Sequence, residues 1–157
     1  MAQQQGAKRA VTTIRLIINA GQAKPAPPVG PALGQHGLNL MGFCKEFNAR
    51  TQQMKPDVPV PVTVTAYADR TFDFQIRSPS PMYFLKRAAG INRCAKSPGH
   101  DAAGTVTLKH IYEIAKIKQQ DPDCQYLSLK GICTSLIGTA RSMGIKVVRN
   151  LDSEATN

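Results

Sequence analysis

The sequence has 157 residues, 42% of them hydrophobic and 19% charged. This length fits one ordinary domain or two small ones, and the composition supports a buried core, which excludes a disordered tail. No apolar run approaches the ~20 residues of a membrane span, which predicts a soluble protein with no membrane partner. Twenty Lys and Arg against ten Asp and Glu leave a net charge of +10, shared equally between the two halves. Such a field attracts polyanions, chiefly nucleic acid or an anionic membrane surface.

The four cysteines and three histidines lack the spacing of a metal site. Cys124 and Cys133 are nine residues apart, whereas zinc knuckles and ribbons space their cysteines by two. The thiols are therefore interpreted as reduced, small hydrophobic side chains, and no metal or cofactor is expected. The first acidic residue is Glu46. A basic, acid-free N-terminus is typical of organelle-targeting segments and equally typical of RNA-binding tails.

The first half of the chain is predicted to form a small α+β domain, sandwich-like, over residues 1–78. Residues 11–20 are β-branched and apolar and predict a strand. Residues 25–31 contain four prolines and predict a stiff, extended loop, neither helix nor central strand. A helix capped by Asn39 is expected over residues 38–51. Strands at 61–67 and 71–77 then form a hairpin, with Phe72, Phe74 and Ile76 on one face.

A short hinge is expected at residues 79–81, because two prolines lie within four residues. The second half, residues 82–150, predicts a three-helix domain, followed by a tail at 151–157. A short helix ends at Gly90, residues 91–104 form a mobile loop, and Thr107 caps the second helix. The last helix starts at Ser128, and residues 145–148 form a brief strand. The predicted buried stripe of this last helix is Leu129, Ile132, Cys133, Leu136, Ala140 and Met143, and Gly144 lies just past the end of the helix.

Nothing in the sequence predicts an enzyme. The glycines around residues 30–37 do not make a dinucleotide-binding fingerprint, and no phosphate-binding Gly-Lys-Ser or Gly-Lys-Thr follows a strand. His36 lies in a glycine-rich turn, where a solvated or backbone-bonded imidazole is more common than a catalytic one. No sequence motif links a carboxylate to a histidine, so the catalytic residues are predicted to be none.

The segment GTARSMG at residues 138–144 is the most informative stretch of the last helix. Gly138, Thr139, Arg141 and Ser142 fall off the buried stripe. A glycine inside a helix costs about 1 kcal/mol against alanine, so it needs a reason. Small hydroxyl side chains and an arginine suit a shallow RNA minor groove. From spacing alone, a helix–helix contact through Gly138 with a solvated Arg141 is an equal alternative.

Several motifs resemble one family. They are GQAKPAPPVGPALGQHGLN at 21–39, FCKEFN at 43–48, YADR at 67–70, KRAAG at 86–90 and GTARSMG at 138–144. In this order they resemble the L11 family of large-subunit ribosomal proteins, and the resemblance runs from about Thr13 to Val148. The proline segment and GTARSMG are each specific to that family.

The resemblance implies a structural protein that binds ribosomal RNA at the GTPase-associated centre, at the base of the ribosomal stalk. Its partners would be large-subunit RNA, stalk proteins and translational GTPases of the elongation factor G type. It implies RNA contacts at the following residues: Gly90, Arg93, Lys96, Gly138, Thr139, Arg141 and Ser142. The prolines that face the factors and thiopeptide antibiotics would be Pro25, Pro28 and Pro31, and the methylated lysine of bacterial members falls on Lys45.

The departures from the bacterial pattern favour an organellar member. Bacterial proteins have a lysine-rich loop where this chain has only Arg93 and Lys96, which puts the RNA role of that loop in doubt. The stretch CQYLSLKGIC resembles plant and algal mitochondrial versions, so a mitochondrial ribosome is expected, with chloroplast or bacterial cytoplasm as alternatives. A DNA regulator of the helix-turn-helix class is the rival function, although the exposed face of the last helix offers one arginine and no Asn or Gln. A pure protein-interaction module would leave the basic second half unexplained.

Overall fold

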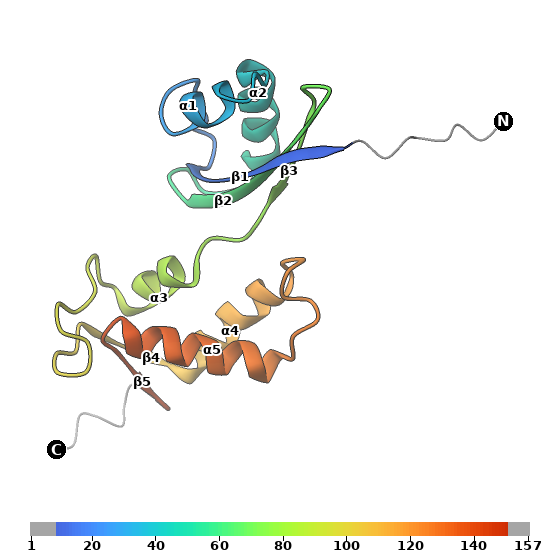
Figure 1. Ribbon diagram of the computed structural model, residues 1–157. Coiled ribbons are helices and arrows are strands. Elements are labelled where there is room, and N and C mark those ends of the chain that lie inside the picture. Colours follow the sequence, from blue (N-terminus) through green and yellow to red (C-terminus); the bar gives the residue numbers. More distant parts are fainter. Residues whose placement is uncertain (1–8, 151–157) are drawn as a thin grey trace. The chain divides into compact units, whose positions relative to one another are not determined.

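The computed structural model describes residues 9–150 and divides the chain into two compact units between Arg77 and Ser78. The first unit holds a sheet with two helices on one face, and the second holds three helices and two short strands (Figure 1). This arrangement confirms the predicted α+β class. Each unit buries its own hydrophobic core.

The sheet of the first unit has the strand order β1-β2-β3 and is antiparallel throughout. Its strands are β1 (Ala10–Asn19), β2 (Pro59–Tyr67) and β3 (Phe72–Ile76). Side chains alternate along β2, so that Val60, Val62, Val64 and Ala66 are buried on one face. The predicted hairpin is present, and Arg70 adopts a positive φ of 59° in its turn.

The helix α2 (Leu40–Thr51) covers the buried face of this sheet. It begins where the sequence predicts, because the Asn39 side chain accepts a hydrogen bond from the Gly42 N–H at 3.1 Å. Phe43 is fully buried, and its ring lies edge-on to Phe72 and Phe74, with centroids 5.9 and 5.3 Å away. An aromatic cluster therefore joins the helix to the hairpin.

The expectation of an extended proline loop is wrong for its second part. Helix α1 (Val29–Gly34) begins directly after Pro28 and contains Pro31. The N–H groups of a helix's first turn have no partner within the helix, so a proline there forfeits no hydrogen bond. Val29 and Leu33 are buried in the core of the first unit. Their burial favours the helix, and the prolines concealed this apolar spacing.

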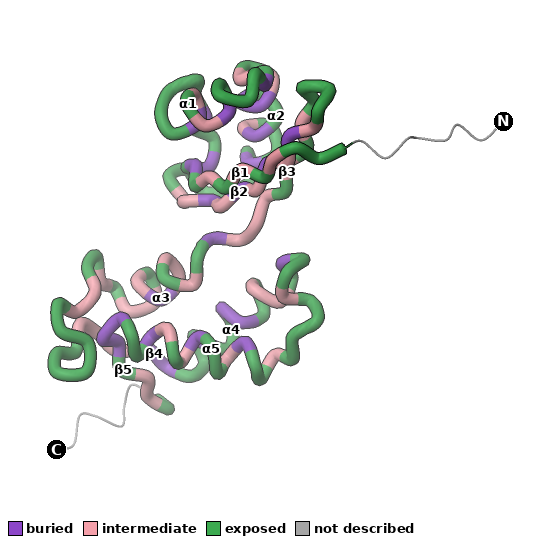
Figure 2. Tube along the Cα trace, in the orientation of Figure 1, coloured by how far each residue is buried: buried purple, intermediate pink, exposed green. Residues whose placement is uncertain are grey.

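The second unit contains the three helices that the sequence predicts and a parallel pair of strands. The helices are α3 (Pro81–Ala89), α4 (Leu108–Gln119) and α5 (Leu129–Ser142). Strand β5 (Ile145–Val148) was predicted, but its partner β4 (Gly104–Thr107) was not. β4 has only four residues, begins with a glycine and ends on the cap of α4, so it has too little alternation to be recognised. Figure 2 shows buried and exposed positions alternating along α5.

The residues expected to form the hinge belong to the start of α3. Ser80 caps this helix, Pro81 is its first residue and Pro79 is buried. Ser78 is also held within the second unit, since its N–H and its hydroxyl donate to the two carboxylate oxygens of Asp121 at 2.9 and 2.7 Å. Lys118 donates to both the Ser78 carbonyl and Asp121 at 3.1 Å. The backbone of the second unit is therefore fixed from its first residue.

Candidate nucleic-acid interface

Helix α5 presents one apolar and one small, polar face. Ile132, Leu136 and Ala140 are buried on the first face, as the spacing predicts, and Met143 continues the stripe past the end of the helix. Gly138, Arg141 and Ser142 are exposed on the other side, and Thr139 is half-buried at its border. Asp and Glu are absent from α5. We call Gly138, Thr139, Arg141 and Ser142 the α5 face.

Gly138 lies in open space. A Cβ atom added there would have no atom of the described chain within 4 Å, apart from its two chain neighbours and the backbone of its own helix. The alternative interpretation, a helix–helix contact that needs glycine at this position, is therefore wrong for contacts among residues 9–150. The glycine leaves a flat place on the α5 face, where a second molecule can approach the helix backbone closely.

The two hydroxyl groups of the α5 face donate to their own helix. Thr139 Oγ1 donates to the Ser135 carbonyl at 3.0 Å, and Ser142 Oγ donates to the Thr139 carbonyl at 2.8 Å. Their protons are occupied, but each oxygen keeps lone pairs that can accept a hydrogen bond. Such an acceptor matches the 2′-hydroxyl of RNA, which can donate, and DNA lacks this group.

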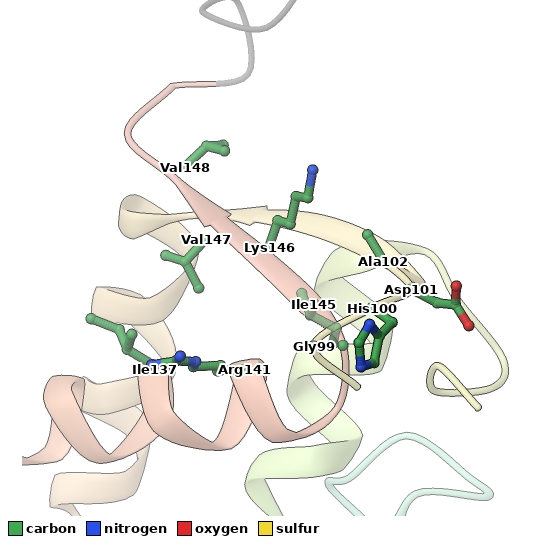
Figure 3. Close-up of a pocket in the computed structure, with 11 residues that line it drawn as sticks. Gly99, His100, Asp101, Ala102, Ile137, Arg141, Ile145, Lys146, Val147 and Val148 are labelled. Atoms are coloured by element: carbon green, nitrogen blue, oxygen red, sulfur yellow. The ribbon is translucent and has the colours of Figure 1, made fainter. Parts of the chain in front are cut away.

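Arg141 extends the α5 face toward a cavity of about 440 Å³. Within residues 9–150, no carboxylate forms an ion pair with its guanidinium. The cavity is bounded by the end of α5, by β5 and by a turn at residues 99–102. Figure 3 shows Ile137 and Arg141 of α5 beneath β5, with Val147 pointing toward them and Lys146 pointing away from the helix.

The segment predicted as a mobile loop is anchored to the end of α5. The Ala95 N–H donates to the Met143 carbonyl at 3.1 Å, and the Ala103 N–H donates to the Gly144 carbonyl at 2.8 Å. Gly144 has a φ of 73°, and a Cβ atom there would lie 2.3 Å from the Cβ of Ala95. These contacts join residues more than forty positions apart, so local sequence patterns do not reveal them.

This anchoring brings the basic loop residues to the end of α5. Arg93 and Lys96 are exposed on either side of Ala95. Gly90, where the loop begins, ends α3 with a φ of 67°, a left-handed conformation that favours glycine. The loop residues singled out in the sequence thus lie near the C-terminal end of the α5 face, within one unit. Lys146 and His100 line the adjoining cavity and were missed. Alternation along β5 could have identified Lys146 as exposed.

The proline segment belongs to the first unit and is also held in place. The Asn48 side chain of α2 accepts from the Ala23 N–H at 2.9 Å and donates to the Ala23 carbonyl at 3.1 Å. Pro25, Pro28 and Pro31 are all exposed beyond this clamp. The positioning role of Asn48 was missed, because both of its hydrogen-bond partners are backbone groups of Ala23, 25 residues away. A polar amide in the middle of an amphipathic helix was the available signal.

Other chemistry is limited in the described part of the chain. Lys45 is exposed on α2, whereas its neighbour Cys44 is buried, and burial raises the pKa of the Cys44 thiol. All four cysteines are free. Residues 9–150 contain no cluster of three His, Cys, Asp or Glu side chains suited to a metal ion. No helix in this range is long and apolar enough to cross a membrane.

Comparison with known proteins agrees with this geometry. The profile described as "Ribosomal protein L11, N-terminal domain" matches residues 14–72, and "Ribosomal protein L11, RNA binding domain" matches residues 77–147. The large ribosomal subunit protein uL11m of Schizosaccharomyces pombe is 50% identical over 137 residues, covering 87% of this chain and 95% of the relative. The uL11m protein of Drosophila melanogaster is 48% identical over 142 residues, covering 90% of this chain and 72% of the relative.

These matches bear on several predictions from sequence. They confirm a structural ribosomal protein that is not an enzyme, with RNA and the ribosome as partners. The relatives are mitochondrial proteins, which confirms the expected location. The plant or algal origin stays a prediction. With both domain profiles matched in order along one chain, the protein belongs to the ribosomal protein L11 family of the large ribosomal subunit.

Proposed function

We propose that the second unit binds large-subunit ribosomal RNA at the GTPase-associated centre through the α5 face. The open position at Gly138 carries this proposal, because it lets the helix backbone lie close to a shallow minor groove. Thr139 and Ser142 would accept hydrogen bonds from ribose 2′-hydroxyls, and Arg141 would contact phosphate. Arg93, Lys96 and Gly90 would extend the contact from the anchored loop.

The first unit would meet the translation machinery. We propose that Pro25, Pro28 and Pro31 face translational GTPases of the elongation factor G type and the stalk proteins. The Asn48 clamp and helix α1 support this role, because they hold these exposed side chains in one arrangement before a partner arrives. Thiopeptide antibiotics would bind on the same side. Lys45 is a candidate methylation site, since its amine is exposed on the neighbouring helix.

The division of labour can be tested with the two units separately, because each has its own core. Residues 78–150 should bind the RNA fragment of the GTPase-associated centre nearly as well as the whole chain, and residues 1–77 should bind it weakly. Equal binding by both pieces would contradict the proposal. Co-sedimentation of the full chain with the large subunit in high salt would establish that the contact is specific rather than a general effect of charge.

The role of the prolines needs a functional measurement. Ribosomes carrying Pro28→Ser or Pro31→Ser should retain the protein but change their factor-dependent GTP hydrolysis and their thiopeptide sensitivity. Normal hydrolysis and normal sensitivity would show that these prolines only shape the start of α1. Because Pro31 lies in the first turn of that helix, circular dichroism of the variants must first show an unchanged fold.

A further inference from the structure

The cavity beside the end of α5 is bounded by this helix, by β5 and by the turn at residues 99–102. Its volume of about 440 Å³ falls in the roughly 300–1,000 Å³ range of small-ligand sites. Backbone hydrogen bonds from Ala95 and Ala103 to the end of α5 fix the loop that closes one side. Gly144 admits that loop at a distance that any side chain would prevent. The cavity shares only Arg141 with the α5 face.

The lining combines an apolar surface with a free strand edge. Ile137 and Val147 are half-buried and lie on the same side of β5 as Arg141 (Figure 3). Within the described chain β5 pairs only with β4, so its other edge offers peptide N–H and C=O groups to the cavity. A planar nucleobase has an apolar face and an edge of donors and acceptors, which fits both surfaces.

The charges around the cavity favour a phosphate-bearing occupant. Arg141, Lys146 and His100 are exposed residues of its lining, and the Lys146 amine points away from Arg141 in Figure 3. Asp101 is the acidic residue among the lining side chains, and its carboxylate points away from Arg141 in Figure 3. An added peptide strand would use the edge of β5 but would leave the Arg141 guanidinium without a partner. A nucleotide uses the apolar surface, the strand edge and the Arg141 guanidinium together.

We propose that this cavity takes the base of one unstacked nucleotide of the bound RNA, with its phosphate at the Arg141 guanidinium. The proposal rests on the RNA-binding function of the second unit and adds a site beside the minor-groove contact. Unstacked bases in RNA junctions are a usual target of sequence-specific recognition, because their edges are free. The α5 face would recognise the shape of the RNA, and the cavity would select one of its bases.

The test combines abasic scanning of the RNA with a variant that fills the cavity. Each nucleotide of the GTPase-associated RNA fragment is replaced in turn by an abasic one, and the affinity of the full chain is measured. Ala102→Phe is the filling variant, since Ala102 is exposed and lines the cavity from the loop side. Gln125→Phe adds the same ring at an exposed position that does not line the cavity and serves as the control.

We expect that removing the base of one nucleotide lowers the RNA affinity of the wild-type chain by about tenfold, which is in the range of single-base stacking contacts. Removing that base should cost the Ala102→Phe chain almost nothing, because its cavity is already filled. The Gln125→Phe chain should behave as wild type. If every abasic position has the same effect on all three chains, the nucleotide site is wrong while the RNA-binding function stands. If the wild-type chain does not bind the intact fragment, the proposed function itself fails.

A second measurement needs no substitution in the cavity. The methyl signals of Ile137 and Val147 should move upfield when the intact RNA binds, because the ring current of a stacked base shields them, and the abasic RNA should not produce this shift. Unchanged methyl signals with the intact RNA would overturn the proposal. The signals of the RNA-free protein give a further check, in which the full chain is compared with a chain that lacks residues 151–157. A difference between the two would also overturn the proposal, because it would mean that the chain's own end occupies the cavity.

Discussion

Helices α2 and α5 are both amphipathic helices with a glycine and an arginine off their buried stripe, yet these residues have different surroundings. In α2, Arg50 pairs with Glu46 and lies over the Phe74 ring, 4.3 Å from its centroid. A Cβ atom at Gly42 would lie 3.2 Å from the Asn39 side chain. In α5, Arg141 has no carboxylate partner within residues 9–150, and Gly138 faces open space.

The difference separates residues that serve the fold from residues available to a partner. The polar residues of α2 contact other parts of their own unit, including the Asn48 clamp on the proline segment. On the α5 face, the Thr139 and Ser142 hydroxyls donate to carbonyls of their own helix. Substitutions in α2 should therefore change stability, and those on the α5 face should change RNA affinity. Each of the following predictions tests this contrast.

The largest effect is expected at Gly138. Gly138→Leu should lower RNA affinity by about 100-fold, because the side chain holds α5 away from the groove and breaks several contacts of about 0.5–1.5 kcal/mol each. The fold should remain, since glycine is a poor helix residue and leucine is a good one. Ala49→Leu on the exposed side of α2 is the matched control. Fluorescence titration with the RNA fragment measures both, and equal affinities would remove the special role of Gly138.

Loss of the two hydroxyl groups should have a smaller effect. Thr139→Ala combined with Ser142→Ala should weaken RNA binding by about tenfold, at about 0.5–1.5 kcal/mol for each lost hydrogen bond. Both side chains lie off the buried stripe, so the circular dichroism spectrum should not change. An RNA with 2′-deoxy sugars at the contacted positions should bind the wild type and the double variant alike. Unchanged affinity for the all-ribose RNA would exclude these hydroxyls from the interface.

Asp121 tests how the second unit is held at its start. Burial alone would raise the pKa of this carboxyl, but hydrogen bonds from Ser78 and Lys118 outweigh burial and place its pKa below the usual value. The charged form therefore stabilises the unit above the unfolded pKa of about 3.9, and this contribution is lost as pH falls through the lower folded value.

Asp121→Asn should destabilise the second unit by about 1–2 kcal/mol at pH 7 and remove this acid-sensitive contribution. Hydrogen exchange at the Ser78 amide, which donates to Asp121, reports the change directly. Exchange at residues of β2 in the first unit should stay as in the wild type. If the Ser78 amide exchanges equally slowly in both proteins, the carboxylate does not hold the start of this unit.

The smallest effect is expected from substituting the two arginines, Arg141 of α5 and Arg50 of α2. Arg141→Gln should weaken RNA binding and reduce the slope of log affinity against log salt by about 0.7–0.9, the value for one phosphate contact. Arg50→Gln should leave that slope unchanged and lower stability by up to about 1 kcal/mol, as expected for an exposed ion pair. Salt titrations of both variants provide the measurement. Equal slopes for Arg141→Gln and wild type would show that Arg141 contacts no phosphate.

The features predicted correctly from sequence are those set by neighbouring residues. Asn39, Thr107 and Ser128 cap their helices because each side chain accepts from an N–H three residues later. The buried stripe of α5 follows from its spacing. The exposed position of Gly138 follows from the same spacing, so much of the candidate interface could be located without a structure.

The features that were missed depend on contacts between distant residues. β4 forms through pairing with β5, and the loop at residues 91–104 is ordered by the end of α5. Asp121 reaches Ser78 across 43 positions. The cavity beside β5 exists only when these segments come together, so its lining residues carry no local pattern. The helix α1 was missed for a different reason, because prolines are common in helix first turns and in loops alike.

The central claim is that the α5 face, rather than any surface of α2, binds the RNA. The most direct test is a backbone amide NMR titration of the full chain with the RNA fragment of the GTPase-associated centre. We predict that the largest shifts fall on Gly138, Thr139, Arg141 and Ser142, with smaller ones at Arg93 and Lys96 and almost none in α2. Shifts concentrated in α2, with the amides of the α5 face unmoved at saturation, would contradict the account.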